Sequence, residues 1–309
     1  MERKNKRKRN PFKESVDERN AIMDEQRAEI RELYLEAYEE AEDTLKSYTR
    51  VDKEEPAKKS EIKFILGSMD SIYRPVDKAT ENIIKNNTDR TINAVLDNNL
   101  KYLSSYGYLS GMDKKAFRER ASEIVLSGKL YDNRWNLSSA IWGDNKARLQ
   151  EINKILSNGI RNNDSIYKIS KRLERYVNPN VASKIDAGRN IFGIRRKIDY
   201  NAQRLARTTV QHAYQEAFVE ATINNPLIIG YEWEATSAHP CDICEERDGV
   251  IFEKDELPLD HPNGMCVIIP VMGAPDDMIR ELVDDWNKGE GDQELNEELD
   301  KFEKYLKND

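Results

Sequence analysis

The helical spacing of apolar residues near the start of the chain is the strongest constraint on its fold. Between residues 17 and 50, apolar side chains recur at steps of three, four or multiples of these, and Glu, Asp, Arg and Lys fill the other positions. The recurring residues are Met23, Ile30, Leu33, Ala37, Ala41 and Tyr48. This pattern predicts one long amphipathic helix, about 50 Å in length at 1.5 Å per residue.

The helical pattern continues after a short charged interruption. The stretch "VDKEEPAKKS" contains Pro56, which lacks a backbone donor, so we expect a hinge or linker there. From residue 62 to residue 130 the spacing is again helical, with Gly107, Gly111 and Gly128 as stops. Asp113 is placed to cap the helix that follows "SGM".

The clearest periodicity lies in "RLQEINKILSNGIRNNDSIYKISKRLERYV", which predicts two helices. We expect Gly159 and the polar "RNNDS" to separate them, with Asp164 or Ser165 as the second N-cap. A further helix is predicted from about residue 199 to residue 222.

The pattern then changes to that of strands. "LIIGYEWEA" alternates between apolar and acidic residues, and "GVIF" and "CVIIPV" are two more short strand candidates that could pair as a hairpin. The acidic segment after Pro275 returns to helical spacing, with a break at Gly289 and Gly291. The predicted fold class is mainly α, with an elongated helical N-terminal region and a helical bundle followed by a small β-hairpin or sheet unit that holds a Cys/His cluster.

These patterns predict a linear organisation of the chain. We expect a basic, disordered arm, a long amphipathic helix, a helical region, an α+β domain and an acidic helical tail. Their boundaries are 1–13, 14–50, 51–130, 131–272 (with the Cys/His unit at 227–272) and 273–309.

Charge and hydropathy narrow the class of protein. The longest apolar run, "CVIIPVM", is far shorter than the roughly 20 residues that span a bilayer, and the basic N-terminus has no apolar segment after it. We therefore expect no membrane segment or signal peptide, and a cytoplasmic product. The net charge of −8 would repel nucleic acid if it were evenly spread.

The start of the chain is strongly basic although the net charge of the chain is negative. It is a candidate for salt-sensitive, sequence-independent DNA binding, because such blocks release counterions from phosphates. The alternative is a solvated arm that only aids solubility. The block consists of Arg3, Lys4, Lys6, Arg7, Lys8 and Arg9.

All three cysteines of the chain lie in one stretch, residues 241 to 266. Cys241 and Cys244 have the C-x-x-C spacing that points two thiolates at a common centre, and His261 and Cys266 follow across a turn-rich segment. Four soft ligands in two pairs predict a structural zinc site, with His239 as a substitute for His261. The alternative is that the three cysteines pack as small buried hydrophobes beside Trp233 and Val267. His212, in the middle of a helix, is interpreted as an ordinary packed or solvated histidine.

Catalytic signatures are missing from the sequence. There is no H-E-x-x-H helix, no phosphate loop, no G-x-S-x-G and no G-x-G-x-x-G. We therefore expect a protein that is not an enzyme.

Four segments, in order, resemble the minor head (head morphogenesis) proteins of tailed phages, the group of the phage Mu F and SPP1-type head proteins. They are "NLSSAIWGDNKARLQEINKILSNGIRNNDSIYKISKRL", "LARTTVQHAYQEA", "YEWEATSAHPCDICEERDGVIF" and "DHPNGMCVIIPV", within residues 131–272. The chain departs from the family pattern at Gly264 and Met265, where cysteine and arginine are usual. A four-thiolate site is therefore impossible, and any zinc must take His261 or His239.

The resemblance implies a structural role inside the virion. The protein would join procapsid assembly in the host cytoplasm, at the portal vertex, with the portal protein, the major capsid or scaffold protein and packaged double-stranded DNA as partners.

Two other classes of function stay open. The first is a zinc module that binds nucleic acid as a regulator, although its acidic residues Glu245, Glu246, Asp248, Glu253, Asp255, Glu256 and Asp260 argue against phosphate contact. The second is a toxin-like enzyme on head-protein architecture, for which the roughly forty residues after the signature are too short.

Overall fold

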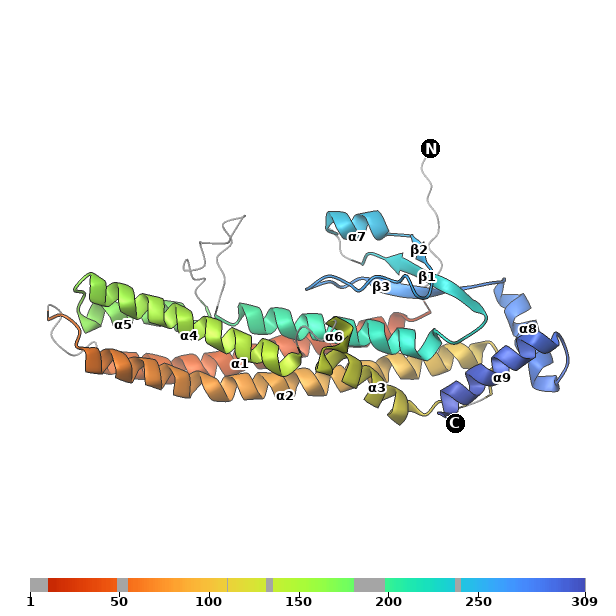
Figure 1. The fold of residues 1–309 in the computed structure, drawn as a ribbon, viewed down its shortest axis with the longest axis horizontal. Helices are drawn as coiled ribbons and strands as arrows, with labels where there is room; N and C mark the ends of the chain where they lie inside the picture. The colour runs from red at the N-terminus through yellow and green to blue at the C-terminus, as the bar shows by residue number, and fades with distance from the viewer. Residues whose placement is uncertain are drawn as a thin grey trace. The chain divides into compact units, whose positions relative to one another are not determined.

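The computed structural model describes residues 11–48, 55–109, 111–131, 136–180, 198–236 and 240–308. Most of these residues are helical, and a three-stranded antiparallel sheet lies near the C-terminal end (Figure 1), so the predicted mainly-α class is confirmed. The elements are α1 (Lys13–Tyr48), α2 (Lys59–Ser105), α3 (Lys114–Ser127), the short 3-10 helix η1 (Lys129–Tyr131), α4 (Leu137–Arg161), α5 (Ile166–Val177), α6 (Tyr200–Thr222), β1 (Ile228–Glu234), α7 (Asp242–Arg247), β2 (Ile251–Phe252), β3 (Val267–Met272), α8 (Asp276–Lys288) and α9 (Gln293–Lys307).

Several predicted helix ends are confirmed in atomic detail. The Asp113 side chain accepts a hydrogen bond from the Ala116 amide at the start of α3. Gly128 ends α3 in the left-handed conformation, with φ of 92°. Gly289 does the same for α8, and α9 then begins after Asp292, so the acidic tail has the predicted break.

The predicted role of Gly159 as a helix breaker is wrong. The helix α4 continues through Gly159 to Arg161, and α5 begins after Ser165, which makes no side-chain capping hydrogen bond. A Cβ at position 159 would lie 2.4 Å from the Ile169 side chain. The glycine is therefore needed because α5 packs closely against α4 at this point.

The described chain divides into two compact units, each built from segments that are distant in sequence. The first unit takes its described residues from 11–23, 86–133 and 207–308, and the second takes its described residues from 24–85 and 134–206. This division differs from the linear one that the sequence pattern predicts.

The second unit is helical, and its mostly apolar interior contains a buried ion pair. Arg148 is buried and contacts both carboxylate oxygens of Asp77 at 2.7 Å, while its other arm donates to the Tyr34 hydroxyl at 3.1 Å. Both contacts to Asp77 come from Nη2, and this buried charge-assisted pair fixes the register of the helices that carry it. Near the start of α6, Arg31 and Asp199 form another ion pair at 3.1 Å.

The first unit contains the sheet, whose strand order is β2-β1-β3. Both outer strands pair antiparallel with β1, so the predicted hairpin between "GVIF" and "CVIIPV" is wrong. The central strand is β1: its residue Tyr231 pairs with Phe252 of β2 on one side and with Pro270 of β3 on the other.

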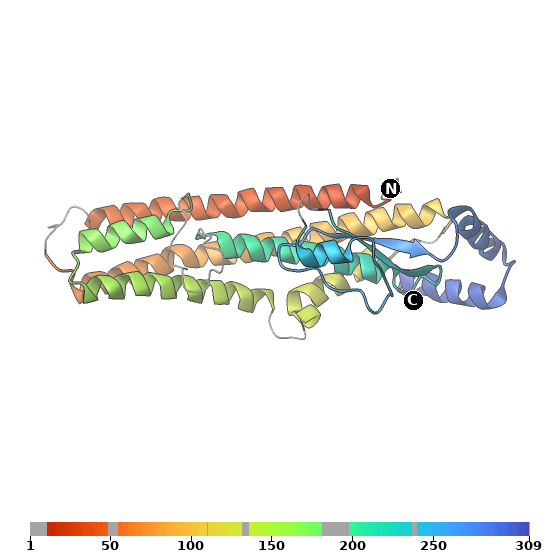
Figure 2. The same cartoon turned by 90° about the horizontal axis from the view of Figure 1, so that it is seen from above.

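One face of the sheet packs on α6. Tyr231 and Trp233 of β1 are buried and Glu232 is exposed, as the alternation predicts. The Tyr231 hydroxyl lies 2.9 Å from that of Thr222 on α6, and both views show the sheet beside this helix (Figures 1 and 2). The same hydrophobic cluster contains Ala213, Tyr214, Ala217, Phe218 and Ala221 of α6 with Val267 and Ile268 of β3.

The last two helices complete the core of the first unit. The Trp286 indole of α8 donates to Asp300 of α9 at 2.9 Å. The Tyr108 ring lies between them, 5.8 Å from the Trp286 ring and 5.9 Å from the Phe302 ring. Their buried apolar residues belong to the same cluster as the sheet: Ile279, Val283, Leu299, Phe302 and Leu306.

None of the helices in the described part of the chain is both long enough and apolar enough to cross a bilayer.

The half-buried Glu216 of α6 makes the stability of the first unit depend on pH. Burial raises the pKa of Glu216 to about 7, and the charge of Glu220 adds to the effect. A raised carboxyl pKa means that the ionised form destabilises the fold, and this cost develops as pH rises from about 4 to 7. We expect Glu216→Gln to raise the free energy of unfolding by about 1–2 kcal/mol at pH 8 and to leave it unchanged at pH 4.

Urea unfolding at the two pH values measures this difference. The exposed Glu281→Gln on α8 is the control and should change neither value. An equal gain for Glu216→Gln at pH 4 and pH 8 would contradict the assignment, because the gain would then not come from the charge.

Candidate metal centre

The C-x-x-C pair is formed by the first turn of α7. Cys241 is the N-cap residue, its carbonyl accepts from the Glu245 amide at 2.9 Å, and Cys244 lies one turn further on. The amides of Cys244 and Ile243 point at the Cys241 sulfur and lower its pKa. The helical turn therefore places both sulfurs on one side.

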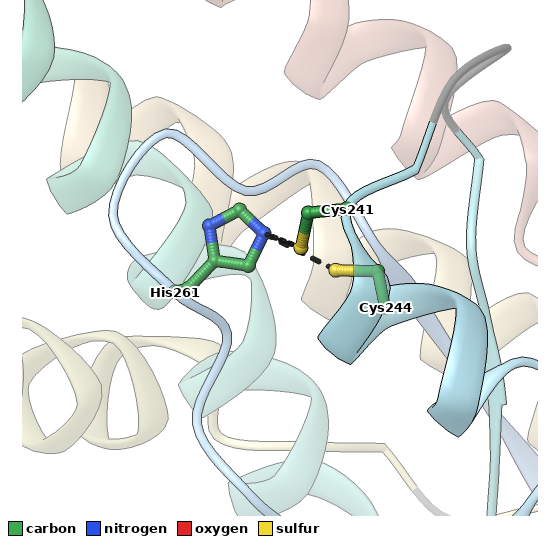
Figure 3. A group of neighbouring side chains, drawn as sticks. All are labelled: Cys241, Cys244 and His261. Carbon is green, nitrogen blue, oxygen red and sulfur yellow. Dashed lines mark hydrogen bonds between the residues drawn. The ribbon is translucent and has the colours of Figure 1, made fainter. Parts of the chain in front are cut away.

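His261 brings a nitrogen to this pair from the long loop between β2 and β3. Its Nε2 lies 3.3 Å from Cys241 Sγ and 3.1 Å from Cys244 Sγ (Figure 3). Its Nδ1 lies 3.0 Å from the Pro262 carbonyl, which can only accept a hydrogen bond. The hydrogen of the neutral ring is therefore on Nδ1, and the lone pair on Nε2 faces the two sulfurs.

Cys266 is the fourth soft donor and directly precedes β3. Its Sγ lies 3.4 Å from Cys244 Sγ. The atoms of Cys241, Cys244 and His261 all lie within 4.8 Å of one another, whereas Cys266 forms a second such group with Cys244 and Asp260. Cys244 thus belongs to both groups, and Cys266 reaches the others through it.

This donor set fits a tetrahedral zinc ion. Bond lengths of about 2.3 Å to sulfur and 2.0–2.1 Å to nitrogen place neighbouring ligand atoms roughly 3.5–3.8 Å apart. The separations of 3.3 and 3.1 Å from His261 Nε2 to the two sulfurs, and of 3.4 Å between Cys244 and Cys266, are a few tenths of an ångström shorter. Cys266 lies more than 4.8 Å from at least one of Cys241 and His261, so it must move closer to complete the tetrahedron. Burial raises the pKa of Cys244 and of Cys266, so both are thiols until a cation displaces their protons.

A cavity gives access to the cluster. Its volume is about 350 Å³, and it is lined by the four Cys and His side chains together with Asn20, Arg207, Thr236 and Asn263, among others. The exposed Cys241 lies at this cavity, whereas Cys244 and Cys266 are buried. A cation can therefore reach the ligands without opening the core.

Asp260 organises the loop that carries His261 and Cys266. One carboxylate oxygen accepts from the His261 amide at 2.8 Å, and the other accepts from the Cys266 amide at 3.1 Å and from Gln211 Nε2 at 2.9 Å. With three donors already bound, this buried carboxylate holds the loop and is not needed as a ligand. Gly264 is required beneath it, because a Cβ there would lie 2.2 Å from the carboxylate.

His212 is packed in the interior and is not one of the candidate metal ligands, as predicted from the sequence. It is buried on α6, its Nε2 donates to the Asp260 carbonyl at 2.9 Å, and its Nδ1 contacts the Tyr131 hydroxyl. Burial lowers the pKa of His212, which keeps the ring neutral in this position.

Trp233 of β1 lies beside the Cys266 sulfur. Its indole Nε1–H is buried and makes no full hydrogen bond in the described part of the chain. Burial raises the pKa of the Cys266 thiol, and this N–H opposes that effect. The sulfur thus has a hydrogen-bond donor available when it becomes a thiolate.

The other predicted site residues lie outside the described residues. These are His239, the substitute ligand, and the basic block formed by Arg3, Lys4, Lys6, Arg7, Lys8 and Arg9.

None of the family models, curated proteins or solved structures compared with this chain matches it. The likeness to phage head proteins therefore rests on the four quoted segments alone.

Proposed function

We propose that Cys241, Cys244, His261 and Cys266 hold a structural zinc ion in a minor head protein of a tailed phage. The observation that carries the metal assignment is the convergence of His261 Nε2 on both sulfurs of the C-x-x-C turn, at 3.3 and 3.1 Å. Three thiolates and one imidazole form the ligand set of a closed, structural zinc site.

The local fold supports a structural role for the ion. The loop between β2 and β3 has no regular secondary structure, and β2 itself is only 2 residues long. Loops of this length gain order from a crosslink, and a bound zinc ion would supply four bonds between the loop, α7 and β3. Asp260 and Gln211, beside the cluster, hold the loop in place through hydrogen bonds.

Metal content tests the zinc assignment. We expect about one zinc ion per chain after expression with zinc, and none in Cys244→Ser, because Cys244 contacts both His261 and Cys266. Mass spectrometry of the native protein gives the ratio. Glu246→Gln is the control: it changes an exposed residue of the same short helix α7 outside the ligand set, and it should keep the metal. Absence of zinc from the unchanged protein would contradict the proposal and favour simple packing of the cysteines.

The head-protein proposal draws on the order of the four similar segments. They fall on α4 with α5, on α6, on β1 with α7 and β2, and on the loop that leads into β3. In the first unit, α6 and β1 belong to one hydrophobic cluster. Cys266 directly precedes Val267, which pairs with Glu234 at the end of β1. We propose that this protein acts in procapsid assembly at the portal vertex, with the portal protein and the major capsid or scaffold protein as partners and the virion as its location, and that it is not an enzyme.

Association with the portal protein tests this role directly. We expect the chain to be retained with the cognate portal protein when the two are co-expressed, across a range of salt concentrations. A pull-down followed by size-exclusion chromatography measures the complex. Co-expression with an unrelated portal protein is the control, and no retention with the cognate portal at any salt concentration would argue against the role.

We also propose that the basic block from Arg3 to Arg9 binds double-stranded DNA without sequence preference. The alternative location for DNA binding is the Cys/His unit, but Glu245, Glu246, Asp248, Glu253, Asp255 and Glu256 are exposed there. An acidic surface repels phosphates, so the arm is the better candidate.

Deletion of residues 1–10 tests the basic block and leaves the buried Phe12 and the start of α1 in place. We expect the deletion to abolish retention of DNA in a gel shift, and the complete chain to show a salt slope of log K on the order of −5, because six cations release counterions. Cys244→Ser should bind DNA as before. The opposite pattern, with binding kept by the deletion and lost in Cys244→Ser, would instead support a nucleic-acid-binding zinc module.

A further inference from the structure

The sheet of the first unit has an outer face, turned away from α6, that carries exposed apolar side chains. Tyr231 of β1 faces α6, so the alternation of side chains along a strand places its neighbour Glu232 on the opposite face. Ile251 of β2 and Ile269 of β3 pair with Glu232 on either side and therefore share this outer face. Ile251 is 55% exposed.

The apolar surface continues towards the start of β1. Gly230 and its partner Val271 lie on the same face, and Ile251 Cγ2 is 3.3 Å from the position that a Cβ of Gly230 would take. Ile229, at the register shift between β1 and β3, is 59% exposed. Large apolar side chains gathered at one exposed place are typical of surfaces that bind a partner. The outer sheet face is defined by Ile229, Gly230, Glu232, Ile251, Ile269 and Val271.

This face is open, whereas the edges of the sheet are poorly suited to a further strand. Helix α6 lies along one side of the sheet, and on the other side the only helix of the described first unit is the short α7 (Figures 1 and 2). At one edge, β3 contains Pro270, which has no amide hydrogen to donate, and at the other edge β2 is only 2 residues long. A helix that packs on the face is therefore the favoured mode of contact.

The charges around the outer sheet face are of one sign. Within the described residues 227–236 and 240–272, neither of the two basic residues is exposed. The Arg247 guanidinium lies 5.2 Å from the centre of the Trp233 ring, and Lys254 Nζ donates to the carbonyls of Ile223 and Asn225. The surface charge of this part of the chain is therefore acidic. Its exposed acidic residues are Glu232, Asp242, Glu245, Glu246, Asp248, Glu253, Asp255 and Glu256.

We propose that the outer sheet face binds a basic amphipathic helix of another protein. Apolar side chains of that helix, at positions i, i+3, i+4 and i+7, would pack on the isoleucines and on Val271, and its Lys and Arg residues would face Glu232 and the surrounding acidic residues. The surface is separate from the metal centre, so the inference depends neither on the zinc assignment nor on the head-protein role.

Charge and apolar content together exclude two nearer occupants. A second copy of the chain would place the same acidic surface against itself, and opposed like charges are unfavourable. The basic block from Arg3 to Arg9 has the right charge but contains no apolar residue, so it cannot cover Ile229 and Ile251.

Titration of the complete chain with a fluorescently labelled peptide tests the proposal. The probe is a peptide of about 18 residues made of Lys and Leu, with the leucines on one helical face. The control peptide has the same composition in an order that gives no apolar face. We expect the probe to bind at least about ten-fold more tightly than the control peptide, because only the probe buries apolar surface.

Variants of the chain locate the binding surface. Ile251→Ser and Ile229→Ser should each raise the Kd of the probe about five-fold or more, and Met278→Ser, an exposed apolar residue on α8, should leave it unchanged. Glu232→Gln should raise the Kd about two-fold or more at low salt and have little effect at about 0.5 M salt, whereas Glu281→Gln should have no effect at either. Circular dichroism checks the fold, and Ile229→Ser decides if Ile251→Ser does not fold.

Three results would overturn the proposal. The first is equal binding of the probe and the control peptide, or a Kd that both isoleucine variants leave unchanged. The second is displacement of the probe by a peptide of residues 1–10 at a similar Kd, which would make the chain's own arm the occupant. The third is a dimer of the unchanged chain in sedimentation that Ile251→Ser dissociates, which would make a second copy the occupant.

Discussion

The candidate metal centre depends on the hydrogen bonds that the Asp260 carboxylate accepts. This carboxylate binds the amides of His261 and Cys266 and the Gln211 side chain, so it fixes two of the four ligands relative to α6. Hydrogen bonds to an ionised acceptor are about twice as strong as neutral ones, and a buried carboxylate without them would be costly. The loop can close around this group only because Gly264 has no side chain.

The helices and the C-x-x-C turn of the Cys/His cluster could be predicted from the sequence because both depend on local spacing. Apolar periodicity locates α1, α4, α5 and α6, and the C-x-x-C turn with a later His and Cys indicates the cluster. The strand pairing could not be predicted in this way. The sequences of β2 and β3 are compatible with a hairpin between these two strands, but in the structure each of them pairs with β1. The role of Gly159 could not be predicted either. Glycine is common both at helix ends and at close contacts between helices, and the sequence alone does not distinguish the two.

The groups around the ligands were missed because they come from distant parts of the sequence. Arg19 and Asp260 meet through Gln211, and these contacts join residues 192 and 49 positions apart. The sequence of α1 nevertheless contains one indication that Arg19 has a buried polar partner. Arg19 falls on the helix face that also carries the buried residues Phe12, Ser15, Ile22, Gln26 and Ile30, and a cation on a buried face needs a polar partner.

The discontinuous first unit has a consequence for the order in which the protein is made. Its core joins residues of α2 and α3 to Leu299, Phe302 and Leu306 of α9. On the ribosome, the chain emerges at about 5–20 residues per second from the N-terminus, so every segment of the second unit has emerged before the Cys/His cluster is made. The apolar faces of α6 and of the sheet then stay partly uncovered until α9 has been synthesised. For those seconds, the nascent chain depends on chaperones or on its own partial collapse to avoid aggregation.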